Sequence, residues 1–151
     1  MIVSESNSDI FAEFEGHDNA VLIHCCNCFN TMGAGIAKLI AARYISVREV
    51  DRATISGDRS KLGSWTSAPA GANRIVVNLY GQYRYGTEKR HLDYDALRKG
   101  LASVVAFYGD VPYITYRLGC NLAGGEWPKV RAIIEEVSGD KHKFTIRDKS
   151  L

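Results

Sequence analysis

The sequence predicts an α/β fold in which a mostly parallel sheet carries helices on both faces. Segments rich in β-branched and apolar residues alternate along the chain with segments whose apolar residues recur every three or four positions. Residues 20–25 are apolar almost throughout, which is typical of a strand that is covered on both faces. Alternating strands and helices favour parallel strands joined by helical crossovers.

The first half of the chain predicts two strands and two or three helical segments. A strand at residues 2–5 is followed by a turn or short helix at 8–11, and the second strand is the apolar run at 20–25. We expect a helix over 33–44, and a further helix from about 47 to 55 that ends near Gly57. The residues expected on the buried stripe of the first of these helices are Ile36, Leu39, Ile40 and Tyr44.

The second half predicts four more strands, which makes about six in all. Strands at 62–68 and 74–80 flank a turn-like segment, and later strands are expected at 113–116 and 144–146. Asp93 or Asp95 can cap a long helix, and Pro128 suits the first turn of the last one. The inner stripes of these two helices are Leu97, Leu101, Val104, Val105 and Tyr108, and Val130, Ile133, Ile134 and Val137.

Composition excludes several classes of protein. With 151 residues, 46% of them hydrophobic and 24% charged, the chain suits a single globular domain spanning residues 1–151. Its 19 basic and 17 acidic residues give a net charge of +2, too small and too dispersed to favour a nucleic-acid surface. No apolar run approaches the roughly 18 residues of a membrane span, and no signal peptide is visible. We therefore expect a cytoplasmic protein with no membrane partner.

Three of the four cysteines lie within residues 24–29, and the fourth is Cys120. The spacing of Cys25 and Cys28, beside His24, is that of zinc ligands, but a second ligand pair at recognisable spacing does not follow. Cysteine is also a small residue that is often buried, and this segment continues a buried strand. We expect neither a metal site nor a cofactor here.

Two glycine-rich loops, residues 27–36 and 117–127, each leave a predicted strand and lead into a predicted helix. Glycine lets backbone amides approach a ligand closely, and a helix amino terminus adds unpaired N–H groups. Neither loop has the spacing of a Walker or dinucleotide-binding motif. A helix cap explains one such loop, but two of them on strands expected to be neighbours predict a clamp for a diphosphate.

The order of these motifs resembles the macrodomain family of ADP-ribose binders. The resemblance runs through residues 21–27, 33–37, 89–94, 119–127 and 135–140, and is closest to the ADP-ribose 1″-phosphate phosphatase branch. It implies a three-layer α/β/α macrodomain with a mostly parallel, mixed sheet of about six strands. It also implies a metal-independent phosphatase that binds ADP-ribose 1″-phosphate, hydrolyses its terminal phosphate, and yields ADP-ribose and phosphate.

The resemblance assigns ligand-binding roles residue by residue. Asp9, followed by Ile10, matches the aspartate that accepts the adenine amine; the alternative for Asp9 is a helix N-cap. Asn27 matches the asparagine that hydrogen-bonds the distal ribose, and its alternative is an Asx turn. Tyr80 and Tyr83 are expected either in the pocket wall or in the core. The loop residues expected to wrap the diphosphate and distal ribose are Gly33, Ala34, Gly35, Ile36, Gly119, Cys120, Asn121, Leu122, Ala123, Gly124 and Gly125.

His24 is the candidate catalytic residue. It immediately precedes the first loop, and histidine titrates near neutral pH, so it could activate a water molecule or become phosphorylated itself. The alternative is a hydrogen-bonded histidine of the core.

Two other functions remain open at this stage. One is an ADP-ribosyl hydrolase acting on modified protein, or on nucleic acid as an ADP-ribosylated substrate; the other is a non-catalytic ADP-ribose reader. Ala123 stands where the branch that removes ADP-ribose from glutamate side chains has an aspartate, which counts against that activity. Glu126 is expected to be a helix cap, and the alternative is that it substitutes for the missing aspartate.

Overall fold

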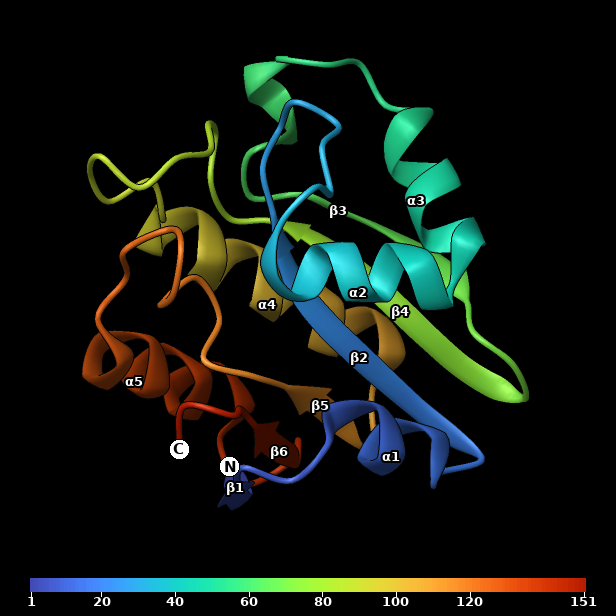
Figure 1. The fold of residues 1–151 in the computed structure, drawn as a ribbon. Helices are drawn as coiled ribbons and strands as arrows, with labels where there is room; N and C mark the ends of the chain where they lie inside the picture. Colours follow the sequence, from blue (N-terminus) through green and yellow to red (C-terminus); the bar gives the residue numbers. More distant parts are fainter.

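The computed structural model describes all 151 residues, which form one six-stranded mixed sheet (Figure 1). The strands are β1 (Ile2–Ser6), β2 (Asn19–Cys26), β3 (Trp65–Pro69), β4 (Asn73–Tyr80), β5 (Tyr113–Thr115) and β6 (Phe144–Arg147). Their order across the sheet is β1-β6-β5-β2-β4-β3, and every neighbouring pair is parallel except β3 and β4. The predicted mostly parallel sheet is confirmed, and so is the pairing of β2 with β5.

Helices form the two outer layers (Figure 1). They are α1 (Ile10–Glu15), α2 (Gly35–Arg43), α3 (Ile45–Arg52), α4 (Tyr94–Tyr108) and α5 (Trp127–Ser138). The first three contact the sheet on one face, while α4 and α5 pack together on the other. The structure is therefore the expected three-layer α/β/α arrangement. No helix is both long enough and apolar enough to cross a membrane.

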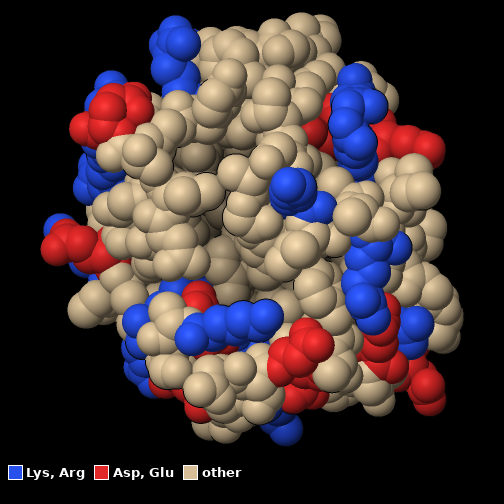
Figure 2. Space-filling model, viewed as in Figure 1, with Lys and Arg blue, Asp and Glu red and all other residues tan.

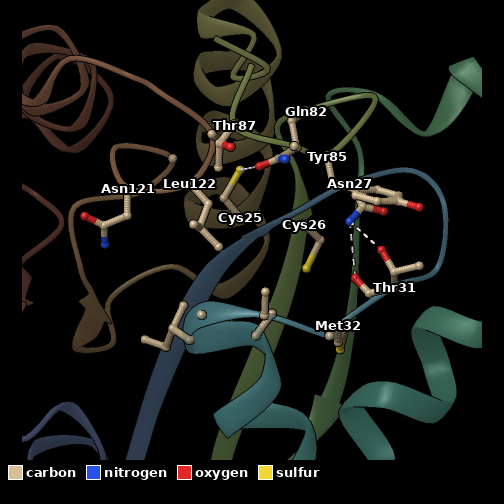
Figure 3. Close-up of a pocket in the computed structure, with 18 of the residues that line it drawn as sticks. Cys25, Cys26, Asn27, Thr31, Met32, Gln82, Tyr85, Thr87, Asn121 and Leu122 are labelled. Atoms are coloured by element: carbon tan, nitrogen blue, oxygen red, sulfur yellow. Dashed lines mark hydrogen bonds between the residues drawn. The ribbon is translucent and has the colours of Figure 1, made fainter. Parts of the chain in front are cut away.

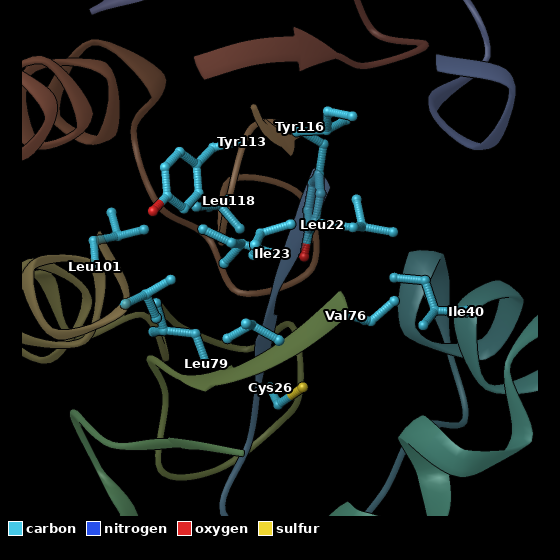
Figure 4. Close-up of a cluster of buried hydrophobic side chains, with 14 of the residues drawn as sticks. Leu22, Ile23, Cys26, Ile40, Val76, Leu79, Leu101, Tyr113, Tyr116 and Leu118 are labelled. Carbon is cyan, nitrogen blue, oxygen red and sulfur yellow. The ribbon is translucent and has the colours of Figure 1, made fainter. Parts of the chain in front are cut away.

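β2 lies inside the sheet, between β4 and β5, and holds the core together (Figure 4). Its residues Leu22 and Ile23 are fully buried and, being consecutive in a strand, point to opposite faces. Ile40 of α2 packs on one side of the sheet and Leu101 of α4 on the other. This double coverage explains why the β2 segment is apolar almost throughout.

Three boundaries or burial assignments differ from expectation. The helix expected at 47–55 runs from Ile45 to Arg52, and the strand expected from residue 62 begins at Trp65 because Arg59–Lys61 forms a 3₁₀ turn ahead of it. The buried stripe expected on α2 is also wrong in part: Ile40 is buried, but Leu39 is 55% exposed. Leu39 borders a cavity instead of packing against the sheet. The buried face of α2 is therefore narrow and consists of Ile40 and Ala41.

The carboxyl ends of β2, β4 and β5 lie at the same edge of the sheet, because these strands are parallel neighbours. The loops that follow them are tied together by backbone hydrogen bonds. Cys28 N donates to Tyr83 O at 3.0 Å, and His91 N donates to Ala123 O at 2.8 Å. The fold thus brings three loops, distant in sequence, to one place.

The contrast between Leu101 and Leu39 gives a first prediction. Leu101→Ala should lower the free energy of unfolding by about 2–5 kcal/mol, because it leaves a cavity in a fully buried site. Leu39→Ala makes the same change at an exposed site and should cost less than about 1 kcal/mol. Urea unfolding followed by circular dichroism measures both, and equal losses would contradict the assignment of Leu39 to the surface.

Candidate functional site

The carboxyl edge of the sheet holds a cavity of about 460 Å³, within the range of small-molecule sites (Figure 3). Three loops form its walls, following β2, β4 and β5, and β2 itself contributes its last residues. The lining residues are Cys25, Cys26, Asn27, Thr31, Met32, Gly33, Ala34, Gly35, Ile36, Ala37, Gln82, Tyr85, Gly86, Thr87, Tyr116, Gly119, Asn121, Leu122 and Ala123.

The first wall is the loop between β2 and α2, and it offers backbone donors. The first hydrogen bond of α2 runs from Lys38 N to Ala34 O at 3.4 Å, so the amides of residues 35–37 have no acceptor within the helix. Gly35 has φ of +58°, and a Cβ atom on Gly33 would meet nothing within 4 Å. Open space beside free amides at a helix amino terminus suits an anionic group.

Asn27 lies where this loop leaves β2, and it both lines the cavity and shapes the turn. Its Oδ1 accepts a hydrogen bond from Phe29 N at 2.8 Å, while its Nδ2 donates to Thr31 Oγ1 at 2.8 Å. The Asx-type contact expected as the alternative is therefore present. Its carboxamide is held in one orientation at the cavity wall (Figure 3).

Part of the second predicted loop faces the cavity and part of it does not. Gly119, Asn121, Leu122 and Ala123 belong to the lining, but Cys120, Gly124 and Gly125 do not. Gly125 N donates to Gly119 O at 2.7 Å and closes the loop, and a Cβ atom on Gly125 would clash with Leu92. Gly124 has φ of +76°, and a Cβ atom on it would lie 3.1 Å from the Cα of Arg90. These two glycines let the loop fold tightly, and the expectation that they face the ligand is not supported.

The third wall is formed by residues 82–87, of which the sequence analysis named only Tyr83 as a candidate for the pocket wall. Gln82, Tyr85, Gly86 and Thr87 line the cavity, and Figure 3 shows the Tyr85 side chain beside Asn27 of the first loop. The sequence shows only a polar stretch here, with no glycine pattern of the kind that marks the other loops. The available signal was topological: the segment follows β4, and β4 is a neighbour of β2.

A second cavity, of about 590 Å³, adjoins the first and contains the predicted Asp9 and Ile10. The two cavities share Ile36, Tyr116 and Asn121, so they form one groove whose junction lies between the two glycine-rich loops. Asp9 caps α1, its Oδ1 accepting from Phe11 N at 2.9 Å. The predicted N-cap is thus present, at a residue that also borders the groove.

The structure does not bring His24 to the cavity. Its side chain is fully buried on the side of the sheet covered by α3, and its Nε2 lies 2.5 Å from Asn78 Oδ1. Asn78 Nδ2 donates to Val47 O and Thr66 Oγ1, so Oδ1 is the acceptor and Nε2 carries the proton. Burial lowers the pKa of His24 to about 4, which keeps the imidazole neutral. His24 is therefore a hydrogen-bonded histidine of the core, which was the alternative to a catalytic role. The expected catalytic contact with a ligand is not supported.

Tyr80 and Tyr83 also lie outside the cavity lining, as the core alternative expected. The hydroxyl of Tyr80 donates to Asp51 Oδ1 at 2.8 Å, and both residues are almost fully buried. Tyr83 packs edge-on against Phe29 of the first loop, and its hydroxyl donates to Gly57 O at 2.7 Å. Both tyrosines support the loops from beneath.

Lys61 fixes the first loop from the protein interior. It is only 8% exposed, and its Nζ donates to Cys28 O at 3.1 Å and to Asn30 Oδ1 at 2.6 Å. Asn30 has φ of +58°, a conformation that asparagine tolerates better than most residues. The ammonium also lies over the Tyr80 ring, 4.9 Å from its centroid. A buried cation therefore holds the turn that follows Asn27.

The polar side chains that line the first cavity are uncharged: Asn27, Thr31, Gln82, Tyr85, Thr87, Tyr116 and Asn121. Burial raises the pKa of the Cys25 thiol to about 12, so this group is also neutral. Figure 2 shows the hollow in this face bordered by tan atoms, with Lys, Arg, Asp and Glu around it. Glu126, at the N-cap position of α5, pairs with Lys129 at 2.7 Å and does not line the cavity.

Comparison with known proteins gives one relative in sequence and several in structure. No protein-family model matches the chain. An uncharacterized 17.5 kDa protein from the tk-vs intergenic region of Enterobacteria phage T4 is 30% identical over 147 residues, covering 91% of each chain.

Solved structures establish the fold. The macrodomain of Mycobacterium tuberculosis DarG superposes with a TM-score of 0.76 over 98% of this chain and 97% of its own, at 17% identity. Thermosipho africanus DarTG, solved in complex with ADP-ribose, gives 0.65 over 85% of this chain and 38% of its own, at 14% identity. The fold expected from the sequence motifs, that of a macrodomain, is confirmed.

The buried imidazole gives a pH prediction. The unfolded chain takes up a proton on His24 near pH 6.5 and the folded chain only near pH 4, so this group makes stability fall as pH drops between these values. The full effect is roughly 3 kcal/mol. In nitrogen-15 NMR of histidine-labelled protein, His24 should remain the neutral Nε2–H tautomer down to about pH 4, and titration near pH 6.5 would contradict this.

Lys61 gives a stability prediction. Lys61→Met removes two hydrogen bonds from a buried cation and should lower the free energy of unfolding by about 2–4 kcal/mol. Lys141→Met makes the same change at an exposed position and serves as the control. Thermal unfolding compares the two, and equal midpoints would show that Lys61 does not stabilise the loop.

Proposed function

The chain belongs to the family of the 17.5 kDa protein of phage T4 and has the macrodomain fold, and on this basis we propose that it binds ADP-ribose. The observation that carries the proposal is the groove formed by two adjoining cavities. The second cavity contains the carboxylate of Asp9, whereas the polar side chains of the first cavity are uncharged. Free backbone amides lie at the junction between them. A nucleoside, a diphosphate and a second sugar match these three parts in order.

The adenosine occupies the second cavity in this proposal. Asp9 Oδ1 is already the cap of α1, so Oδ2 is the oxygen that accepts the exocyclic amine of adenine. Phe11 and Ile36 supply apolar surface for the base. Asp9 thus serves both as a cap and as a ligand contact, two roles that the sequence analysis treated as alternatives.

The diphosphate lies at the junction, between the glycine-rich loops of residues 27–36 and 117–127. The amides of residues 35–37 carry the partial positive charge of a helix amino terminus, which favours phosphate. The distal ribose then enters the first cavity beside Asn27, whose Oδ1 keeps a lone pair for a ribose hydroxyl. The ADP-ribose complex of Thermosipho africanus DarTG, which shares the fold, supports this choice of ligand.

Hydrolysis of ADP-ribose 1″-phosphate stays a prediction from the motif resemblance. Loop amides would stabilise charge on the phosphoryl oxygens, but the imidazole expected to activate water lies in the core. Removal of ADP-ribose from a protein or nucleic acid likewise remains an alternative. Binding is therefore the activity that the geometry supports best.

Calorimetry with a steric variant tests the proposal. ADP-ribose should bind with one-to-one stoichiometry, and Gly33→Val should weaken binding at least tenfold, about 1.4 kcal/mol, because its side chain enters open space beside the free amides. Ala102→Val, on the exposed face of α4, is the control and should bind like the unmodified protein.

Both variants should unfold cooperatively, as checked by circular dichroism. Absence of any binding heat for the unmodified protein at high ligand concentration would refute ADP-ribose as the ligand, and full affinity in Gly33→Val would refute the placement of the diphosphate.

A further inference from the structure

β3 lies at one edge of the sheet, with β4 on one side and no strand on the other (Figure 1). Just beyond the strand, Ala70 N donates a hydrogen bond to Arg74 O at 2.9 Å. Because every second residue of an antiparallel strand bonds to its partner, this contact shows that the even-numbered residues of β3 face β4. The main-chain groups of Trp65, Ser67 and Pro69 therefore point away from the sheet.

Most of these outward groups, which we call the β3 edge, have no partner. The N–H and C=O groups of Trp65 and Ser67 make no hydrogen bond within the protein. Pro69 has no N–H, and its carbonyl oxygen accepts from Ser46 Oγ at 3.1 Å. The β3 edge thus offers donors and acceptors at the spacing of a strand, and another extended chain is the partner that pairs with such a row.

An aromatic cluster lies beside the β3 edge, on the face of the sheet covered by α4. Phe107 of α4 is 71% exposed, and its ring centroid lies 5.3 Å from that of Trp65. Tyr108 joins the cluster, and its hydroxyl donates to Ser67 Oγ at 2.9 Å. Since alternate residues of a strand point to the same face, the exposed Pro69 is on this face too. The unpaired main chain therefore has an exposed apolar surface next to it.

This edge of the sheet has no charge on or beside it. Residues 62–73, which include β3, contain no charged side chain, and neither do residues 100–109, which include the part of α4 that packs on β3. At the opposite edge of the sheet, Glu5 of β1 pairs with Arg131 at 3.0 Å. Charges on edge strands prevent unwanted pairing, and β3 has only Pro69 in that role.

We propose that β3 pairs with β3 of a second copy of this chain, antiparallel and with Ser67 on the two-fold axis. The two Ser67 residues then exchange N–H to C=O hydrogen bonds, and Trp65 N–H of each copy donates to Pro69 O of the other. Because proline has no N–H, the row of hydrogen bonds ends there. Once two copies have paired, neither has a free β3 edge, so the assembly closes as a dimer.

The chemistry of the β3 edge favours a second copy over an unrelated peptide. β3 is already held as a strand by β4, so pairing two such strands avoids the cost of ordering a free peptide. A symmetric contact places an uncharged surface against itself, and no like charges meet. Directly opposite residues of an antiparallel pair share a face, so the Trp65 and Phe107 rings of each copy meet Pro69 of the other.

The dimer leaves the groove of each copy open. Its sheet is continuous, with the six strands of one copy followed by the six of the other. The two-fold axis reverses the strand direction, so the carboxyl ends of β2, β4 and β5 point in opposite directions in the two copies. The two grooves therefore lie at opposite ends of the assembly, and the inference does not rest on ADP-ribose binding.

Sedimentation equilibrium and amide hydrogen exchange test the inference on the unmodified protein. The average mass should rise with concentration from one chain to two, and exchange of the Trp65 and Ser67 amides, measured by NMR, should slow in parallel. A chain that stays monomeric up to about 1 mM would overturn the proposal. A dimer in which these two amides exchange as fast as in the monomer would also overturn it.

A charge exchange at the two-fold axis tests the register. Ser67→Lys and Ser67→Glu each place like charges opposite one another and should weaken the dimer at least about tenfold. An equimolar mixture of the two variants should dimerise at least about tenfold more tightly than either alone, because opposite charges then meet. A folding defect cannot produce this rescue, and its absence when circular dichroism shows both variants folded would refute the pairing at Ser67.

An exposed apolar pair tests the aromatic contact. Phe107→Ser removes a ring from the proposed interface and should weaken the dimer at least about tenfold. Ile55 is equally accessible, at 72% exposed, and lies outside β3 and α4, so Ile55→Ser is the control and should dimerise like the unmodified protein. Equal weakening by both substitutions would refute an interface at the β3 edge.

Discussion

The parallel direction of β2, β4 and β5 is the constraint on which the rest of the site depends. Parallel neighbours end at the same edge of the sheet, so the loops that follow them must meet there, whatever their distance in sequence. Backbone hydrogen bonds between the loops, such as Cys28 N to Tyr83 O, then join them into one unit. The groove is therefore a consequence of the sheet topology, and the loop sequences determine only its chemistry.

Those loops keep their shape because polar groups are buried beneath them. Lys61 holds the turn at Asn30, and Tyr80 and Asp51 hydrogen-bond under the same turn. The His24–Asn78 contact extends this network through Thr66, whose Oγ1 lies 3.0 Å from the Tyr80 hydroxyl. Burial raises the pKa of Asp51, which shows the cost of placing its charge here. In return, buried polar groups whose hydrogen-bond partners are all present fix one arrangement of the loops.

Much of the fold and about half of the groove could be predicted from the sequence, for identifiable reasons. Apolar periodicity located β2, α4 and α5, and glycine patterns located the loops after β2 and β5. Periodicity failed for Leu39, because a helix beside a cavity can expose an apolar residue. It could not find Gln82 or Thr87, since a polar loop has no pattern of its own and reaches the site only through the pairing of β4 with β2.

His24 shows why nearness to a loop in the chain does not place a side chain in the site. His24 and Cys26 are two residues apart in β2 and point to the same face, and Cys26 Sγ lies 3.5 Å from His24 Nε2. Cys26, at the end of the strand, borders the cavity, whereas His24 lies two residues further from that end, is fully buried and hydrogen-bonds to Asn78 of β4. With the imidazole in the core, the polar side chains that line the first cavity are uncharged. In the proposed complex, the backbone amides of residues 35–37 are then the groups that meet the negative charge of the diphosphate.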